Sequence, residues 1–308
     1  MSHIVALCGG VGGAKLAFGL AQVLPPQDLT VIVNTGDDFE HLGLHISPDI
    51  DTVLYTLAGL ADRTRGWGVA DESWNFMAAL GRLGGETWFN LGDCDLATHV
   101  ERTRRLHSGE TLSQVTAALA RALGIGPAIV PMSDDAVRTV VSTTTGEMPF
   151  QRYFVAEQCK PVVTALQFAG ADAAHLAPTA AAALARSDLG AVIICPSNPW
   201  LSIDPILAVP GIAAALAAGS APVIAVSPLV GGRAIKGPTA KLMTELGLIP
   251  GVAAIARHYA GVIDRLVIDG ADAADAAALP CPALVTPTVM AGDAERIALA
   301  RAILKWVL

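Results

Sequence analysis

The stretch CGGVGGAK, residues Cys8 to Lys15, combines four glycines and a lysine, and the kind of phosphate loop it forms separates a dehydrogenase from a nucleotide hydrolase or a rarer class. It follows the apolar run of residues 3–7, which predicts a strand, and it leads into a helical pattern that we expect over residues 13–23. Glycines between a strand and a helix let backbone N–H groups close around an anion at the helix N-terminus, where a lysine adds positive charge. We therefore predict a phosphate-binding loop formed by Gly9, Gly10, Gly12, Gly13 and Lys15; the alternative is a tight strand-to-helix turn, but four glycines and a lysine exceed what such a turn requires.

The spacing of this loop excludes two well-known phosphate motifs. A dinucleotide fingerprint GxGxxG that starts at Gly10 would need its third glycine at position 15, where the chain has Lys15. A Walker A loop needs glycine directly before the lysine and Ser or Thr after it, but Ala14 and Leu16 stand there. The loop is thus a phosphate cradle of a different kind.

Strand and helix patterns alternate on either side of a more helical middle region. Near-continuous apolar strands of this kind are typical of a parallel sheet that is covered on both faces. We predict one α/β domain over residues 1–308, with a modified Rossmann-like fold, a mostly parallel sheet with helices on both faces, and an added helical cap region in a mainly helical insertion at about 50–135. Strands are expected at residues 29–34, 190–195, 222–227 and 265–269, a hairpin from 137–143 and 150–155, and helices at 50–60, 71–83, 97–106, 112–123, 171–185, 212–218, 239–246 and 294–307.

Composition narrows the class of protein. The 308 residues are 53% hydrophobic and carry a net charge of -8 without a cluster of Lys and Arg, which argues against a nucleic-acid-binding face. The five scattered cysteines have no ligand spacing, which favours reduced thiols in a cytoplasmic protein. The uncharged stretch of residues 205–232 is interrupted by Pro and Gly, so we expect a buried helix and strand there and no membrane span.

Aspartates gather in the segment NTGDDFEHLGLHISPDIDT, residues 34–52. Carboxylates at this density repel one another unless a cation neutralises them, and Mg²⁺ takes one or two carboxylates while water and substrate phosphate fill its other positions. The alternative is that Asp49 or Asp51 only caps the following helix. A magnesium site and a helix cap both remain open for this segment.

Two further loops follow predicted strands, where an open α/β sheet binds its ligands. In CPSNPWLSI, Ser197 and Asn198 stand between two prolines and offer hydrogen bonds to a nucleotide, although the same residues suit a plain turn. In SPLVGGRAIKGP, Gly232 and Lys236 could cradle a second phosphate or a base.

Taken together, these blocks resemble the 2-phospho-L-lactate transferase family of deazaflavin coenzyme biosynthesis. The resemblance runs from Gly9 to about Met290. Any one block is weak evidence, but eight blocks in this order are strong evidence. They are GGVGGAK, NTGDD, SPDIDTVLYTLAG, WFNLGDCDLATH, PMSDD, PSNPWLSIDPIL, SPLVGGRAIKGP and TPTVM.

The resemblance implies a Mg²⁺-dependent enzyme that moves a phosphorylated three-carbon acid from a guanosine diphosphate-linked, GTP-derived donor. The implied acceptor is the ribityl hydroxyl of 7,8-didemethyl-8-hydroxy-5-deazariboflavin, and GMP is released. Carried over by motif, Asp51 and Asn90 would contact the acceptor, although many family members have Lys or Arg at the position of Asn90. The glycine loop with Ser197 and Asn198 would hold the donor, and Asp37 and Asp49 would hold the metal.

Attack on the donor diphosphate places charge on the departing GMP, which Mg²⁺, Lys15 and loop amides can neutralise. We expect Asp51 or Asp49 to accept the hydroxyl proton.

Two other classes of protein stay open: a Rossmann-like nucleotide-binding protein without turnover, and an NAD-dependent oxidoreductase. The partners expected are small molecules, and the apolar composition is compatible with a homodimer. The acid carried by the donor (phospholactate, phosphoenolpyruvate or 3-phosphoglycerate) is not fixed by the sequence.

Overall fold

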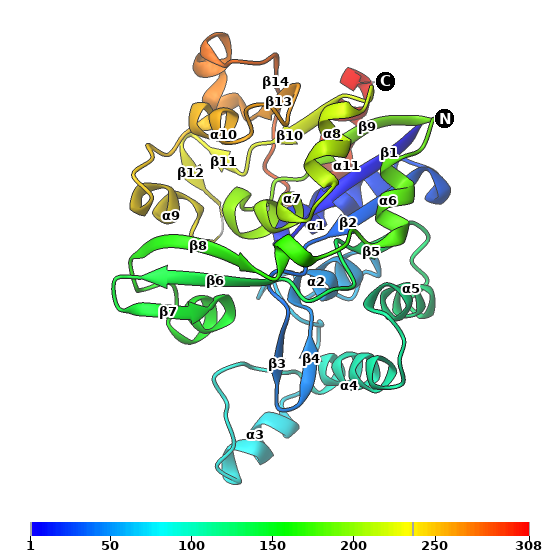
Figure 1. The fold of residues 1–308 in the computed structure, drawn as a ribbon, viewed down its shortest axis with the longest axis vertical. Helices are drawn as coiled ribbons and strands as arrows, with labels where there is room; N and C mark the ends of the chain where they lie inside the picture. Colours follow the sequence, from blue (N-terminus) through cyan, green and yellow to red (C-terminus); the bar gives the residue numbers. More distant parts are fainter. Residues whose placement is uncertain (1, 236, 308) are drawn as a thin grey trace.

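The computed structural model describes residues 2–235 and 237–307, and its centre is a seven-stranded sheet (Figure 1). Every strand pair in this sheet is parallel. The sheet order is β14-β13-β10-β9-β1-β2-β5, which is the Rossmann order with one strand added at the end. The strands are β1 His3–Cys8, β2 Leu29–Val33, β5 Ala128–Pro131, β9 Leu189–Ile194, β10 Val223–Val226, β13 Arg265–Ile268 and β14 Ala283–Val285.

Successive residues of each central strand enter two separate cores, one on each face of the sheet. In β1, Val5 and Leu7 belong to one cluster, whereas Ile4 and Ala6 belong to the other. Side chains alternate between the faces of a strand, so a strand that is apolar throughout must be covered on both sides. This explains why the strands read as unbroken apolar runs.

Helices from different parts of the chain cover the two faces. One face is covered by α1 Gly10–Ala21, α2 Pro48–Leu57, α5 Leu112–Ala122 and α11 Asp293–Val307. The other face is covered by α6 Pro178–Leu184, α7 Asp204–Ala208, α8 Ile212–Ala218, α9 Thr239–Glu245 and α10 Val252–His258. The predicted α/β fold is therefore confirmed.

Smaller elements extend from the lower end of the sheet in Figure 1. One group comprises the hairpin β3 Phe39–His41 and β4 Leu44–Ile46 with the helices α3 Asn75–Arg82 and α4 Asp93–His107. The other is an antiparallel sheet of order β7-β6-β8, with β6 Arg138–Thr143, β7 Gly146–Pro149 and β8 Val163–Ala169. A short hairpin joins β11 Leu229–Val230 to β12 Arg233–Ala234. The single domain and its insertion at about 50–135 stay predictions.

Two expected elements are wrong. Residues 150–155 do not form the second strand of the hairpin, because Arg152–Ala156 is a π-helical turn. Phe154 in this turn stacks on Phe150, which precedes it, with ring centroids 5.3 Å apart. The hairpin partner is the preceding β7, and β8 is a third strand that the sequence prediction missed. The helix expected over 171–185 starts only at Pro178, since proline has no N–H and is best tolerated in the first turn of a helix.

Among the described residues, no single helix is long and apolar enough to cross a membrane. Pro199–Ala208 and Ile212–Ala218 reach that length and composition only as a pair bent by 85°.

Candidate active site

The glycine loop lies where the sheet order reverses, between β1 and β9. Strands on the two sides of this point run on to opposite edges, so their following loops separate and leave a crevice for ligands. The loop after β1 and the loop after β9 are joined there, because the Gly9 N–H donates to Ser197 Oγ at 3.1 Å. The two donor-binding segments predicted from the sequence therefore meet at the carboxyl ends of the central strands.

Two of the loop glycines are required by close packing. A Cβ on Gly12 would lie 2.3 Å from the Pro196 carbonyl oxygen, and one on Gly13 would lie 2.5 Å from Ser197 Oγ. A side chain at either position would push α1 away from the loop that follows β9. These glycines thus set the width of the crevice.

Three polar side chains meet at the start of α1. The Gly10 N–H donates to Asp49 Oδ1 at 2.7 Å, so a carboxylate already occupies part of the helix N-terminus. Asn34 Nδ2 donates to Asp49 Oδ2 at 2.9 Å and to Asp37 Oδ1 at 3.1 Å. The structure therefore brings Asp37 and Asp49, both predicted as metal ligands, to the same amide of Asn34.

The two carboxylates are buried and close enough to repel each other. Burial, followed by the charge of Asp49, raises the pKa of Asp37 well above its usual value. Burial also raises the pKa of Asp49 to about 6, although the hydrogen bonds from Asn34 and Gly10 favour the charged form. Each carboxylate accordingly prefers to hold a proton or to face a cation.

These residues fit a magnesium ion that is shared with a substrate. In the part of the chain that the structure describes, no group of three or more His, Cys, Asp or Glu side chains is placed to hold a metal ion by itself. Mg²⁺ needs only one or two carboxylates when phosphate and water complete its shell. Beside the pair, Asp38 is buried; its Oδ1 has no hydrogen-bond partner among the residues that the structure describes, while its Oδ2 accepts from Ser47 at 2.8 Å. Asp37 and Asp49 would hold the ion, with oxygen ligands of the kind that Mg²⁺ prefers.

Asp51 lies in a second polar cluster, between α2 and α4. Both of its oxygens accept hydrogen bonds from the fully buried Arg102, from Nη1 at 3.1 Å and from Nη2. Burial raises the pKa of Asp51, and Arg102 opposes that rise. The guanidinium thus fixes the orientation of the carboxylate and leaves each oxygen a second lone pair.

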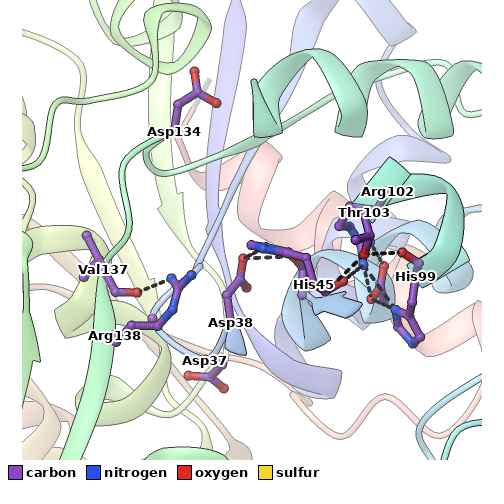
Figure 2. Close-up of polar contacts among 12 residues, drawn as sticks. Asp37, Asp38, His45, His99, Arg102, Thr103, Asp134, Val137 and Arg138 are labelled. Carbon is purple, nitrogen blue, oxygen red and sulfur yellow. Dashed lines mark hydrogen bonds and ion pairs between the residues drawn. The ribbon is translucent and has the colours of Figure 1, made fainter. Parts of the chain in front are cut away.

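His99 extends this cluster toward Asp95. Its Nδ1 lies 3.6 Å from Asp51 Oδ2, and its Nε2 lies 3.3 Å from Asp95 Oδ1, which also accepts from the Tyr55 hydroxyl at 2.7 Å. Although burial acts to raise it, the contacts with His99 and Tyr55 hold the pKa of Asp95 below its usual value. Figure 2 shows His99 and Arg102 close together, with the Asp38–His45 pair beside them.

Asn90 lies in a different place, in an open groove of about 560 Å³. The groove is aromatic on one side, where Trp67 and Trp74 pack edge to face with ring centroids 6.0 Å apart and Arg65 lies over both rings. Trp67 is 44% exposed. A flat aromatic ligand would find indole surface and an amide in the same groove.

The other residues predicted to bind the donor lie in three different parts of the structure or outside its described residues. Lys15 Nζ donates to the Met290 carbonyl at 3.0 Å. The Asn198 side chain accepts from the Trp200 and Leu201 N–H groups at the start of a π-helical turn, so it supports the loop. Gly232 forms the β11–β12 turn with a φ of +70°, and Lys236 lies outside the described residues.

Sequence reasoning missed Asn34, Arg102 and the two tryptophans as site residues. A signal for the buried cluster was present: Asp95, His99 and Arg102 recur at spacings of four and three on one helix, which places them on one face. Asn34 follows β2 directly, as a residue of the ligand-binding edge does. The indole groove had no such signal, because residues 60–74 are mostly loop.

Comparisons with known proteins cover nearly the whole chain. Residues 4–293 match the model of the family described as 2-phospho-L-lactate transferase CofD. The chain is 42% identical to a phosphoenolpyruvate transferase of Kitasatospora aureofaciens, covering 97% of this chain and 98% of that protein. It is 41% identical to a phosphoenolpyruvate transferase of Streptomyces griseus, with 97% and 96% covered, and 37% identical to one of Mycobacterium tuberculosis, with 88% and 89% covered.

The fold also matches a solved structure. A crystal structure of a UPF0052 family member from Bacillus halodurans superposes with a TM-score of 0.64 at 13% identity, and the match covers 99% of both chains. At this identity the likeness concerns the fold alone.

Proposed function

This chain belongs to the 2-phospho-L-lactate transferase CofD family, and from that premise we propose the reaction that it catalyses. A phosphorylated three-carbon acid moves from a guanosine diphosphate-linked donor to the ribityl hydroxyl of 7,8-didemethyl-8-hydroxy-5-deazariboflavin. The observation that carries the proposal is the meeting of the glycine loop, Ser197 and the Asp37–Asp49 pair at one point of the sheet. A diphosphate donor needs amides and a cation together, and these residues supply both needs.

The groove at Asn90 supports an aromatic acceptor. Its volume of about 560 Å³ and its indole surface suit a tricyclic deazaflavin, whose ring would pack against Trp67 and Trp74. The Asn90 amide would hydrogen-bond the polar edge of that ring. The family's frequent Lys or Arg at this position would do the same with a charged donor group.

In the proposed reaction, the acceptor hydroxyl oxygen attacks the phosphorus that carries the acid. A new P–O bond forms, the P–O bond to GMP breaks, and GMP departs with the bridging oxygen. Mg²⁺, when bound at Asp37 and Asp49, supplies charge neutralisation on the diphosphate. Asp51 accepts the hydroxyl proton, because Arg102 holds its carboxylate in one orientation and each oxygen retains a lone pair.

We propose phosphoenolpyruvate as the acid that the donor carries. The support is that relatives from three genera, 37–42% identical to this chain, are phosphoenolpyruvate transferases. Phospholactate and 3-phosphoglycerate are the competing acids.

Mass spectrometry of the product tests the proposal. The purified protein would receive the deazaflavin, Mg²⁺ and the three guanylylated donors in equal amounts. We expect the phosphoenolpyruvyl ester of the deazaflavin as the main product. A different ester as the main product would show that the donor carries another acid. If no ester forms but the protein binds the nucleotide, the result would favour a binding protein without turnover.

The role of Asp51 has its own test. Asp51→Asn should lower kcat by at least about 100-fold, the usual contribution of a general base. Full turnover with only weaker acceptor binding would show that Asp51 is not the proton acceptor and would make Asp49 the next candidate.

A further inference from the structure

A second, smaller pocket of about 70 Å³ lies beside α1, next to the glycine loop. Val11 and Lys15 line it from one face of α1, and Thr52 and Thr56 line it from one face of α2, since residues four apart in a helix lie on the same side. Arg296 of α11 closes it. We call it the α1–α2–α11 pocket.

Arg296 is the unusual member of this pocket. The residue is only 5% exposed, and its Nε is buried without a hydrogen-bond partner in the part of the chain that the structure describes. Its Nη1 lies 3.1 Å from Asp293 Oδ1, an oxygen that has no hydrogen-bond partner within residues 2–235 and 237–307. A guanidinium has five N–H donors, and leaving a buried donor unsatisfied is costly. The guanidinium also lies over the Phe18 ring, 5.3 Å from the ring centroid, so its partners are Asp293 and this ring, and Nε is the donor left unsatisfied among the described residues.

The charges around the pocket favour an anion. Arg63 also lines it and pairs with the same Asp293 at 2.9 Å, so one carboxylate faces two guanidinium groups. Burial lowers the pKa of Arg296; Asp293 opposes that effect and Arg63 adds to it. Asp62 is the carboxylate among the lining residues, and it is engaged by Arg65 at 2.9 Å and by two backbone N–H groups.

We propose that the α1–α2–α11 pocket binds the carboxylate of the three-carbon acid at the end of the donor. The inference rests on the proposed function. A planar guanidinium matches the two oxygens of a carboxylate. Thr56 lines the same pocket, whereas the hydroxyl of Thr52 already donates to the Pro48 carbonyl at 2.8 Å. The pocket is too small for a nucleoside, whereas a carboxylate fits.

The position of the pocket agrees with this role. Val11 belongs to the glycine loop, where the diphosphate is expected, and Trp67 lines both this pocket and the acceptor groove. An acid held here would place its phosphorus between the diphosphate cradle and the acceptor hydroxyl. Arg296 would then select donors that end in a carboxylate.

Two donors separate this role from general support of the fold. One is guanosine diphosphate-linked phosphoenolpyruvate, and the other is an analogue with an ethyl group in place of the acid. For Arg296→Met we expect KM for the acidic donor to rise about 10-fold to 100-fold, as for loss of a hydrogen bond to a charged group, and KM for the ethyl analogue to stay unchanged. Arg296→Lys should recover part of the loss.

The control is Arg301→Met, an exposed position on the same helix, which should leave both KM values unchanged. An equal rise of KM for both donors in Arg296→Met and Arg296→Lys would overturn the proposal. A second measurement does not depend on turnover: the binding of phosphoenolpyruvate alone, followed by calorimetry without donor or acceptor. We expect wild type and Arg301→Met to bind it and Arg296→Met to bind at least about 10-fold more weakly.

The arms also distinguish this inference from the proposed function. If phosphoenolpyruvate binds in a way that depends on Arg296 but no donor is turned over, the pocket keeps its role as a carboxylate site and the proposed transfer reaction is wrong. If the acidic donor is turned over but Arg296→Met changes KM equally for the acidic donor and the ethyl analogue, the transfer reaction stands and the pocket is not the carboxylate site.

Discussion

Arg102 illustrates how one buried side chain can order a site. It is fully buried, and its main ionic partner is the Asp51 carboxylate on another helix. Removing one partner of a buried ion pair leaves a charge without water or a counter-ion, which is far more costly than the loss of an exposed pair. The pair therefore joins α4 to α2 at the carboxylate that we assign to the acceptor.

For Arg102→Met we expect a loss of about 3–5 kcal/mol in the free energy of unfolding, measured by urea denaturation. The matched change on the same helix is Arg104→Met, because Arg104 pairs with Glu101 at the surface and should contribute less than about 1 kcal/mol. The double variant Asp51→Asn, Arg102→Met should recover part of the stability. Equal effects of the two single variants would contradict the account.

Trp67 contributes an exposed indole ring to the groove that we assign to the acceptor. Trp67→Ala removes an exposed indole from the acceptor groove, and we expect the deazaflavin Kd to rise about 10-fold, in line with aromatic stacking energies. Fluorescence quenching of the deazaflavin measures this. Trp306→Ala, on the far end of α11 against Arg265, should leave the Kd unchanged, and an equal effect of both changes would remove the groove as acceptor site.

At the scale of elements, the junction between α1 and the loop after β9 depends on glycine. Gly12→Ala would bring a methyl group 2.3 Å from the Pro196 carbonyl oxygen, so the helix or the loop must move. We expect a loss of about 1–3 kcal/mol in stability, as for overpacking, and a weaker affinity for GDP. Calorimetry on Gly12→Ala and on the control Gly270→Ala, where nothing lies within 4 Å of the new atom, measures both effects. Normal GDP affinity in Gly12→Ala would show that the junction does not shape the donor site.

The sequence predicted elements well where one local signal was dominant. The first strand and the strand that ends before Asn34 follow from apolar runs bounded by glycine or polar residues. The turn at residues 150–155 was mistaken for a strand because aromatic residues favour strands, yet their spacing of four suits a helical turn. Local composition therefore predicts the two strands correctly, whereas the turn at residues 150–155 depends on tertiary packing.

At the scale of the whole molecule, the strand order assembles the site. Asp49 stands at the start of α2, whereas residues 9, 34 and 197 follow three strands of the parallel sheet, which bring these three residues to one edge. Because parallel strands end at a common edge, this convergence could be predicted from the sequence. The pairing of Asp51 with Arg102 could not, since it depends on how α4 packs against α2.

Stability should depend on pH through Asp49. Its pKa is about 6 in the folded state, above its usual value, so between about pH 4 and pH 6 the folded protein holds a proton that the unfolded chain has released. Without metal, this group therefore stabilises the fold less as pH rises through that window. The full penalty, up to about 3 kcal/mol, is present above pH 6.

Thermal melts of wild type and Asp49→Asn at pH 5 and pH 7.5 measure this effect. The metal-free wild type should lose more stability than the variant on going to pH 7.5, and Mg²⁺ should raise Tm at pH 7.5 in the wild type alone. Parallel pH dependence in the two proteins would contradict the assignment of Asp49.

Transfer from a guanylylated donor to a deazaflavin at the β1–β9 crevice releases one GMP for each ester formed, so GMP release reports the reaction itself. Chromatography of a reaction with the phosphoenolpyruvyl donor should show GMP only when deazaflavin and Mg²⁺ are both present. Asp37→Asn and Asp49→Asn should each lower that rate by at least about 100-fold, as loss of a metal clamp on the diphosphate would. GMP release at the same rate without deazaflavin, or unchanged in both variants, would contradict the account.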